Sequence, residues 1–292
     1  MKLSIATKFN LVVLTIFTLG FVAAGFIAHQ LLAESARQET LQNARLLMES
    51  AKAVRTYTSK QIVPLLETQL KYEFHPQSVP SYSAVENFNY VMKAFPDFSY
   101  KEATLNPTNL RDRATDWEAD IVSKLRSDTN LQEYFGERDT PTGRYLYLAR
   151  PLQIKDAACL ACHSTPDAAP KTMLDKYGAN NGFGWTLNEV VGAQVISVPM
   201  SVPLERAEAI FKTFMLSLLG VFGFVFISLN IMMHFFVTRR LRRLAHVADQ
   251  VSMGKFDVDE LSDAGGDEIS RLAQSFGRMR TSLASALKML GE

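Results

Sequence analysis

The chain has very few cysteines, with only two among its 292 residues. A zinc site needs four ligands, and no second cluster of cysteine and histidine exists to complete one around this pair. An excess of charge of one sign is also missing, because 31 basic and 30 acidic side chains give a formal net charge of +1, so composition does not favour nucleic acid as a partner. Ser-His-Asp, metal-hydrolase and phosphate-loop patterns are absent too, and we therefore expect no enzymatic activity.

Both cysteines fall in one short stretch, Cys159-Leu160-Ala161-Cys162-His163. This pattern is typical of covalent haem c attachment, in which two thiols add to the vinyl groups of one haem and the adjacent histidine becomes the proximal iron ligand. A redox or structural disulfide between the two cysteines is the alternative. We predict one haem c per chain, attached through Cys159 and Cys162 and bound at the iron by His163.

Two apolar runs, 9–32 and 210–237, are each long enough to cross a lipid bilayer. A cleaved signal peptide is the alternative for the first run, because Lys2 and Lys8 form a basic start ahead of it. The run is longer than a usual signal sequence and continues into a polar helical pattern without a clear cleavage site. We therefore expect an uncleaved membrane anchor.

Basic side chains flank the outer ends of both runs, with Lys2 and Lys8 before the first and four arginines within 239–243 after the second. The positive-inside rule then predicts a two-pass protein of the bacterial inner membrane with both termini in the cytoplasm. Haem c is normally attached on the outer side of that membrane, so this topology agrees with the motif. The predicted segments are a cytoplasmic N-terminus (1–8), a first span (9–32), an extracytoplasmic haem domain (33–209), a second span (210–237) and a cytoplasmic C-terminal region (238–292).

The predicted outer domain mixes helical and strand patterns. Pro64 should end or kink its first helix, because proline lacks the backbone donor and its ring clashes with the preceding turn. The glycine-rich stretch 177–185 is either an ordinary tight turn or a place where backbone approaches a flat ligand. We expect helices over 34–63, 84–94 and 114–125, and strands over 100–105, 143–150 and 192–198.

Several of these segments together resemble the bacterial and cyanobacterial c-type haem sensor domains with a PAS-like fold, over roughly residues 40 to 203. The resemblance implies an α+β domain in which the haem sits against an antiparallel sheet and serves redox or small-ligand sensing. In that family a cysteine from the early helix can be the sixth iron ligand, and the absence of a third cysteine excludes this here. The matching segments are 100–109, 159–166, 177–178, 182–185 and 191–194.

The ligand on the opposite side of the iron is left open by the sequence. His75 is the only other histidine in 33–209, which makes it the first candidate. Met48, Met92 and Met173 are alternatives, as is a vacant or exchangeable position. A His/Met pair would suit electron transfer at raised potential, whereas a vacant position would admit a diatomic gas.

Apolar residues after the second run recur at spacings of three and four, which predicts two coiled-coil helices. Gly254-Lys255-Phe256-Asp257 opens a connector between them, and Asp267-Glu268 place acids where the dipole of the second helix favours them. A generic amphipathic hairpin would show the same pattern. The residues concerned are Leu241, Leu244, Ala248 and Val251 in the first helix, Val258 and Leu261 in the connector, and Ile269, Leu272, Phe276, Met279, Leu283, Ala286 and Leu290 in the second.

This arrangement, over about 236–290, resembles a HAMP linker, although the usual proline near the start of the first helix is replaced by Arg239-Arg240-Leu241. In that family, two chains form a parallel four-helix bundle that relays movement of a membrane helix to an output module. The resemblance therefore implies a homodimer. The chain stops at Glu292, so we expect a separate cytoplasmic output protein, for example a kinase.

The combined prediction is a membrane-anchored sensor whose haem c responds to redox state or to a ligand and moves the second span and its helices. Two other functions compete with it. The first is a membrane-tethered monohaem cytochrome that transfers electrons to or from a periplasmic partner, and the second is a structural dimeric anchor in which the haem stabilises the fold.

Overall fold

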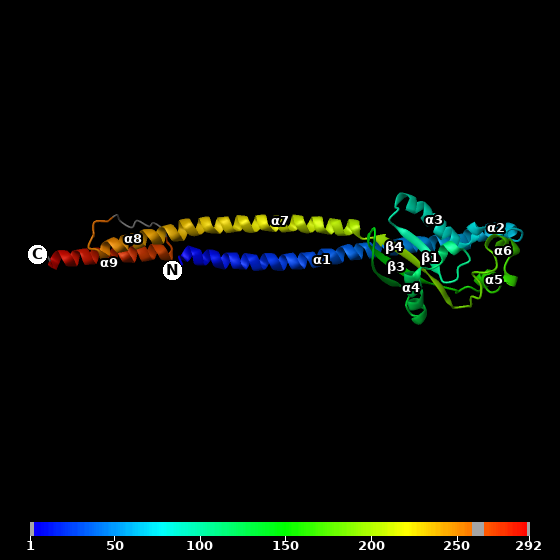
Figure 1. The fold of residues 1–292 in the computed structure, drawn as a ribbon. Helices are drawn as coiled ribbons and strands as arrows, with labels where there is room; N and C mark the ends of the chain where they lie inside the picture. The colour runs from blue at the N-terminus through cyan, green and yellow to red at the C-terminus, as the bar shows by residue number, and fades with distance from the viewer. Residues whose placement is uncertain (1–2, 259–265, 291–292) are drawn as a thin grey trace. The chain divides into compact units, whose positions relative to one another are not determined.

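The computed structural model describes residues 3–258 and 266–290 and separates into two units. The sheet unit is His29–Ile210, and the helical unit combines the residues up to Ala28 with those from Phe211 onward. Figure 1 shows the order of the elements along the chain. Of the residues named above, Lys2, Leu261 and Glu292 lie outside the described residues, as does the side chain of Leu290.

The sheet unit contains one four-stranded sheet with the order β1-β4-β3-β2, and every neighbouring pair is antiparallel. The predicted α+β class with an antiparallel sheet is confirmed. The sequence analysis missed β2, because this edge strand carries Glu137, Arg138 and Asp139 and lacks apolar alternation. The strands are β1 (Ser99–Thr104), β2 (Tyr134–Thr140), β3 (Gly143–Gln153) and β4 (Val190–Pro199).

Helices cover both faces of this sheet. On one face, α1 (Ile5–Tyr57) and α3 (Pro80–Ala94) pack against the strands, and Met48 of α1 is 1% exposed in that core. On the other face, α4 (Asp116–Ser127) buries its own apolar side chains. The first core includes Leu41, Ala44, Phe88, Tyr100, Leu146, Leu148, Ile196 and Val198, and the second includes Ala103, Ile121, Val122, Leu125, Ala149 and Val195.

The first long helix loses its regular form before Pro64. α1 ends at Tyr57, a π-helical turn η1 (Thr58–Ile62) follows, and α2 (Val63–Leu70) begins with the proline in its first turn. Proline has no N–H to donate to the carbonyl four residues earlier, and its ring would clash with that carbonyl. The wider π-helical turn leaves room for the ring. The predicted effect of Pro64 is therefore present, but it falls one turn earlier in the chain.

Short elements connect the strands and carry the cysteine motif. The stretch from 157 to 177 contains η4 (Ala157–Cys159), α5 (Leu160–His163), η5 (Pro166–Ala168) and α6 (Lys171–Tyr177). Two further turns are η2 (Pro76–Ser78), before α3, and η3 (Leu110–Asp112), after β1.

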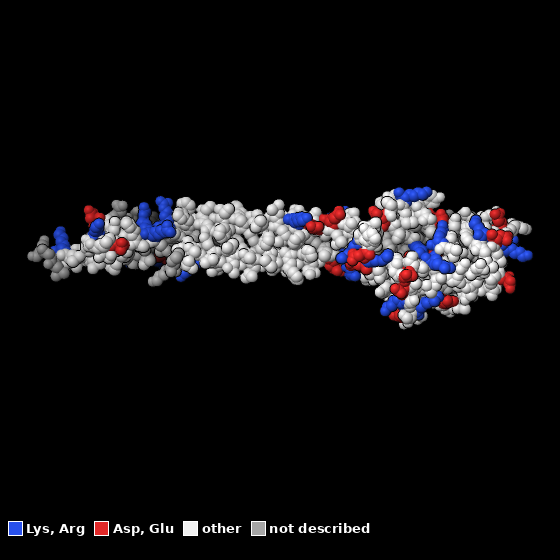
Figure 2. All heavy atoms as spheres, in the orientation of Figure 1, with Lys and Arg blue, Asp and Glu red and all other residues white. Residues whose placement is uncertain are grey.

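The helical unit contains the two helices that are long and apolar enough to cross a membrane. One is formed by the start of α1, and the other by α7 (Ser201–Met232) continued by the π-helical η6 (Met233–Thr238). Phe17 and Phe222 stack between them with ring centroids 4.8 Å apart. Figure 2 shows that most of the visible surface over the two apolar runs carries no charged side chain, as a lipid-facing surface requires; the one charged residue within these runs is Lys212, near the start of the second.

The last two helices of this unit are α8 (Arg239–Ser252) and α9 (Glu268–Leu290). Leu244 and Val251 are buried, as the heptad pattern predicts. Arg240 of α8 forms an ion pair of 2.5 Å with Asp267, and Asp267 accepts a hydrogen bond from the Ser270 N–H at the start of α9. This pairing holds the start of the second helix against the first.

Candidate haem-binding site

The cysteine turn, formed by η4 and α5 (157–163), is shaped by Asp156, which precedes it. The carboxylate of Asp156 accepts a hydrogen bond of 2.9 Å from the Ala158 N–H, and its carbonyl accepts another from Cys159. A side-chain acceptor at this position favours the start of a helical turn. Because Cys159 and Cys162 are three positions apart in that turn, they emerge on the same side.

His163, at the end of the same turn, has a fixed ring orientation. Its Nδ1 lies 2.7 Å from the carbonyl oxygen of Gly182, and the ring stacks on Trp185 with centroids 4.0 Å apart and planes 15° apart. A carbonyl only accepts hydrogen bonds, so Nδ1 carries the proton and Nε2 presents a lone pair. Burial lowers the pKa of His163, which favours the neutral ring that binds metals.

The glycine-rich stretch forms turns that support this histidine. Gly182 has φ +83°, and a Cβ added to it would lie 2.0 Å from Oγ1 of Thr108 and 2.8 Å from its backbone N and Cα. Asn106 accepts a hydrogen bond from the Gly182 N–H, and the N–H groups of Gly184 and Trp185 donate to the carbonyls of Ser164 and His163. The predicted tight turns are present, and an approach of this backbone to a flat ligand stays a prediction.

Both cysteines are free thiols and are partly buried. Burial raises the pKa of each thiol. For Cys159, the Asp156 carboxylate adds to this effect, while the guanidinium of Arg55 opposes it. Two free thiols in one turn, followed by a histidine with an available Nε2, are the donor set that covalent haem c requires. The residues present therefore fit the group that the motif predicts.

The structure adds a polar network that the sequence analysis did not identify. Glu102 of β1 is 1% exposed, and its carboxylate accepts a hydrogen bond of 2.6 Å from the Tyr100 hydroxyl and pairs with Arg55 of α1. Gln194, opposite Glu102 in β4, donates to the Tyr100 oxygen at 3.0 Å. Burial, together with Glu102, raises the pKa of Tyr100. The sequence signal for this network was the spacing of Tyr100 and Glu102, which are two positions apart in a strand and therefore lie on one face of the sheet.

His75, the first candidate for the opposite iron ligand, lies in the loop between α2 and α3. Its carbonyl accepts a hydrogen bond of 2.7 Å from the Ser78 hydroxyl, and the preceding Phe74 N–H donates to Thr172 of α6. The loop is thus held against the helix that follows the cysteine turn. Within residues 3–258 and 266–290, no hydrogen bond links the His75 ring to the cysteine turn, so its role as a ligand stays a prediction.

The three methionines named as alternatives differ in burial. Met48 lies in the first hydrophobic core and Met173 of α6 is 2% exposed, whereas Met92 of α3 is partly buried. A thioether in a packed core contributes mainly by filling space. Burial does not separate Met48 from Met173, so all three methionines stay candidates for the opposite iron ligand.

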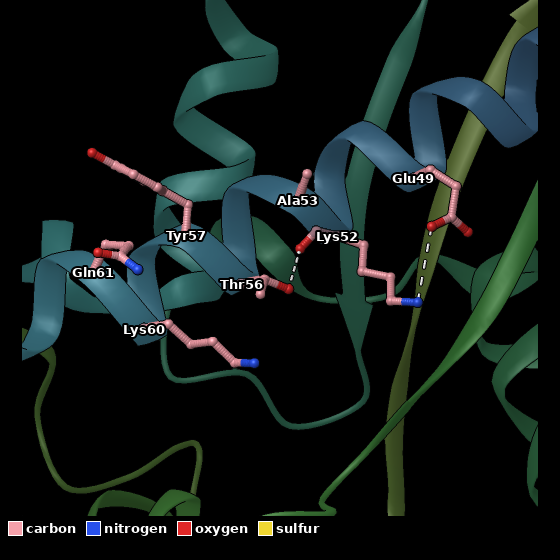
Figure 3. A pocket seen from close by; sticks show the side chains of 7 residues that line it. All are labelled: Glu49, Lys52, Ala53, Thr56, Tyr57, Lys60 and Gln61. Carbon is pink, nitrogen blue, oxygen red and sulfur yellow. Dashed lines mark hydrogen bonds and ion pairs between the residues drawn. The ribbon is translucent and has the colours of Figure 1, made fainter.

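A hollow of about 450 Å³ follows the outer side of α1 and η1. Its lining comes from one continuous helical segment, so it is open on its other sides, and none of the three motif residues belongs to it (Figure 3). Lys52 points toward Glu49, and their charged atoms are 3.9 Å apart. The hollow is thus a surface feature of this helical segment. It is lined by Glu49, Lys52, Ala53, Thr56, Tyr57, Lys60 and Gln61.

An α+β domain with a Cys-x-x-Cys-His turn, followed by an apolar helix and a pair of heptad helices, has the organisation of a haem sensor with a HAMP domain. The family model described as Tll0287-like matches residues 33–199, and the HAMP domain model matches residues 232–285. Because the first match covers more than half of the chain, the protein belongs to the Tll0287-like family. The predicted combination of a haem-sensor family domain with a HAMP linker is confirmed.

Among solved structures, the chain is similar to the cyanobacterial heme-protein Tll0287, with a TM-score of 0.43 and 16% sequence identity. The similarity covers 55% of this chain and 95% of that chain. No curated protein matches the chain.

Proposed function

We propose that this protein is a membrane-anchored haem c sensor that transmits a redox or small-ligand signal through its HAMP domain to a separate output protein. The observation that carries the proposal is the His163 ring, held by the Gly182 carbonyl with Nε2 available, in one turn with two free thiols. Cys159 and Cys162 would attach the haem, and His163 would bind its iron. The bound haem would supply a one-electron redox couple and an iron site for a small ligand.

The chain itself contributes orientation and shielding to this site. The stack of Trp185 on His163 keeps the ring plane fixed, and the hydrogen bond at Nδ1 selects the tautomer. The proposal places the site in the bacterial periplasm, because haem c is attached there and the basic flanks of both apolar helices favour that topology. It assigns no catalytic step to any residue.

The proposed transmission uses two copies of the chain. Leu272, Met279 and Leu283 of α9 are 45% or more exposed in the single chain, and they lie at heptad positions. In a parallel bundle with a second copy, these side chains would be covered by their counterparts. The HAMP match favours this function over the electron-carrier alternative, since electron transfer gives the paired helices no role.

The haem assignment is tested by replacing both thiols. In Cys159→Ala with Cys162→Ala, covalent haem should be lost, and a denaturing gel stained for haem should show no band. Ser164→Ala, a neighbouring change that leaves all three motif residues, is the matched control and should stain like the wild type. Haem staining that survives the double substitution would refute attachment at these cysteines.

The signalling assignment is tested by crosslinking. Single cysteines at positions 279 and 283 of α9 should crosslink between chains in full-length protein, with different efficiency in the oxidised and reduced states. Position 278, where Arg278 is exposed on another side of the helix, is the control and should crosslink weakly in both. Identical patterns in the two redox states would favour the electron carrier.

A further inference from the structure

One side chain outside the cysteine motif holds the peptide that orients His163. The Gly182 carbonyl, which binds Nδ1 of His163 at 2.7 Å, belongs to the peptide that joins residues 182 and 183. Asn106 binds the peptide on each side of that one: its Oδ1 accepts a hydrogen bond of 3.2 Å from the Gly182 N–H, and its Nδ2 donates one of 3.3 Å to the Phe183 carbonyl. A single amide group thus brackets the peptide that carries the acceptor.

The loop that carries Asn106 also reaches the ring of His163. It follows β1, which ends at Thr104, and Oγ1 of Thr108 lies 3.5 Å from Nδ1 of His163. Of the two contacts at Nδ1, the one of 2.7 Å to the Gly182 carbonyl is within the ordinary range of a hydrogen bond. The position of the Gly182 carbonyl therefore decides how strongly Nδ1 is bound.

The glycine-rich stretch depends on other parts of the chain to hold this carbonyl in place. Its later part is fixed by a main-chain hydrogen bond of 2.9 Å from the Gly184 N–H to the Ser164 carbonyl. Gly182 comes before that bond, has a left-handed backbone and has no side chain with which to anchor itself. Asn106 supplies an anchor for it from the loop after β1.

We propose that Asn106 is a positioning residue that sets the electron donation of His163 to the haem iron by holding the 182–183 peptide against Nδ1. This inference rests on the proposed haem c function. A hydrogen bond from Nδ1 to a fixed acceptor makes the imidazole a stronger electron donor, and a stronger donor stabilises the oxidised iron. Asn106 therefore keeps the midpoint potential of the haem lower than it would be if the peptide were free to move.

Asn106→Ala should raise this midpoint potential. Without the amide the 182–183 peptide is free to turn away, the hydrogen bond at Nδ1 weakens, and the oxidised iron loses stabilisation. We expect the ratio of oxidised to reduced haem to fall about threefold to tenfold at a fixed applied potential, and a tenfold change is ~59 mV for a one-electron couple. Asn106 is exposed and belongs to neither hydrophobic core, so the substitution should leave the packing of the domain intact.

The experiment combines a spectroelectrochemical titration with amide hydrogen exchange, both on the full-length protein with its covalent haem. The Gly182 N–H should exchange faster in Asn106→Ala than in the wild type, because its acceptor is gone. Asn109→Ala is the matched control, since Asn109 lies in the same loop and its side chain accepts the N–H of Arg111 at 3.2 Å. This control should leave the potential and the exchange at Gly182 unchanged.

Two further variants separate the amide group from the rest of the side chain. Asn106→Gln keeps the amide and should return the potential toward that of the wild type. Asn106→Ser shortens the side chain by one bond and removes the Nδ2 donor, so it should raise the potential as alanine does. If Asn106→Ala does not load haem, the potential of Asn106→Ser decides the question.

A potential in the alanine or serine variant no higher than that of Asn109→Ala would overturn the inference. A raised potential in Asn106→Ala with unchanged exchange at Gly182 would overturn it too, because the effect would then not pass through the peptide. A wild-type protein without covalent haem would instead overturn the proposed function, together with this inference.

Discussion

Replacing Gly182 by alanine should disturb the candidate site more than an equivalent change two residues away. Gly182 and Gly184 both have a left-handed backbone, with φ +83° and +79°. A Cβ at position 184 meets nothing within 4 Å, whereas a Cβ at position 182 meets both the side chain and the backbone of Thr108. The two variants therefore share the conformational strain and differ in the clash.

The expected loss can be estimated from these contacts. A left-handed conformation costs an L-residue roughly 1–2 kcal/mol, which is the expected loss of unfolding free energy in Gly184→Ala. Forcing a methyl group into filled space adds about 1–3 kcal/mol, so Gly182→Ala should lose about 2–5 kcal/mol in total. The Gly182 carbonyl holds His163, so the haem spectrum should also change in this variant alone.

The assay is a urea titration of the full-length haem protein in detergent, followed through the haem absorption. For a denaturant sensitivity of about 1–3 kcal/mol per molar urea, the extra clash lowers the midpoint by about 1 M relative to Gly184→Ala. Adding Thr108→Ala to Gly182→Ala should recover only part of this difference, because the backbone contacts of 2.8 Å remain. Equal midpoints for Gly182→Ala and Gly184→Ala would refute the reasoning.

Two other predictions concern the surroundings of the site. His75→Ala should change the absorption spectrum of the haem in at least one redox state if His75 is the second iron ligand, and an unaltered spectrum in both states would reject that role. Burial, opposed by Arg111 and aided by Glu102, raises the pKa of Asp112 to about 6, so the folded chain holds this proton more tightly than the unfolded chain. The contribution of Asp112 to stability is thus present at low pH and lost as the pH rises from about 4 through about 6. Asp112→Asn should become more stable than the wild type over that range. The difference in unfolding free energy at neutral pH should be at most about 3 kcal/mol. Urea midpoints of the two proteins at pH 4 and pH 7 measure this, and a difference that does not change with pH would contradict it.

The parts of the fold that the sequence predicted are those specified by local patterns. β3 and β4 alternate or are rich in β-branched residues, and both were expected close to their observed ends. The edge strand β2 was missed because it pairs with one strand only, β3, and its exposed charged residues obscure any alternation of apolar and polar residues. A strand at the edge of a sheet is specified by pairing across space more than by its own pattern.

The candidate site divides in the same way. Cys159, Cys162 and His163 are adjacent in sequence, so their pattern could be read without a fold. The acceptor for His163 is 19 residues further on, and Glu102 is 47 residues from Arg55. Such contacts form only when α1, β1 and the glycine-rich stretch pack together, and no short sequence pattern predicts that packing.

The hydrogen bond that orients His163 ends on a main-chain oxygen. A peptide carbonyl does not titrate, so the electron donation of the imidazole would stay constant across the pH range in which a carboxylate acceptor would change its charge. Substitution of a side chain cannot delete this acceptor either, and only a change in backbone path can move it. The orientation of His163 therefore depends on no titrating acceptor, and a substitution near position 182 can change it only by moving the main chain there.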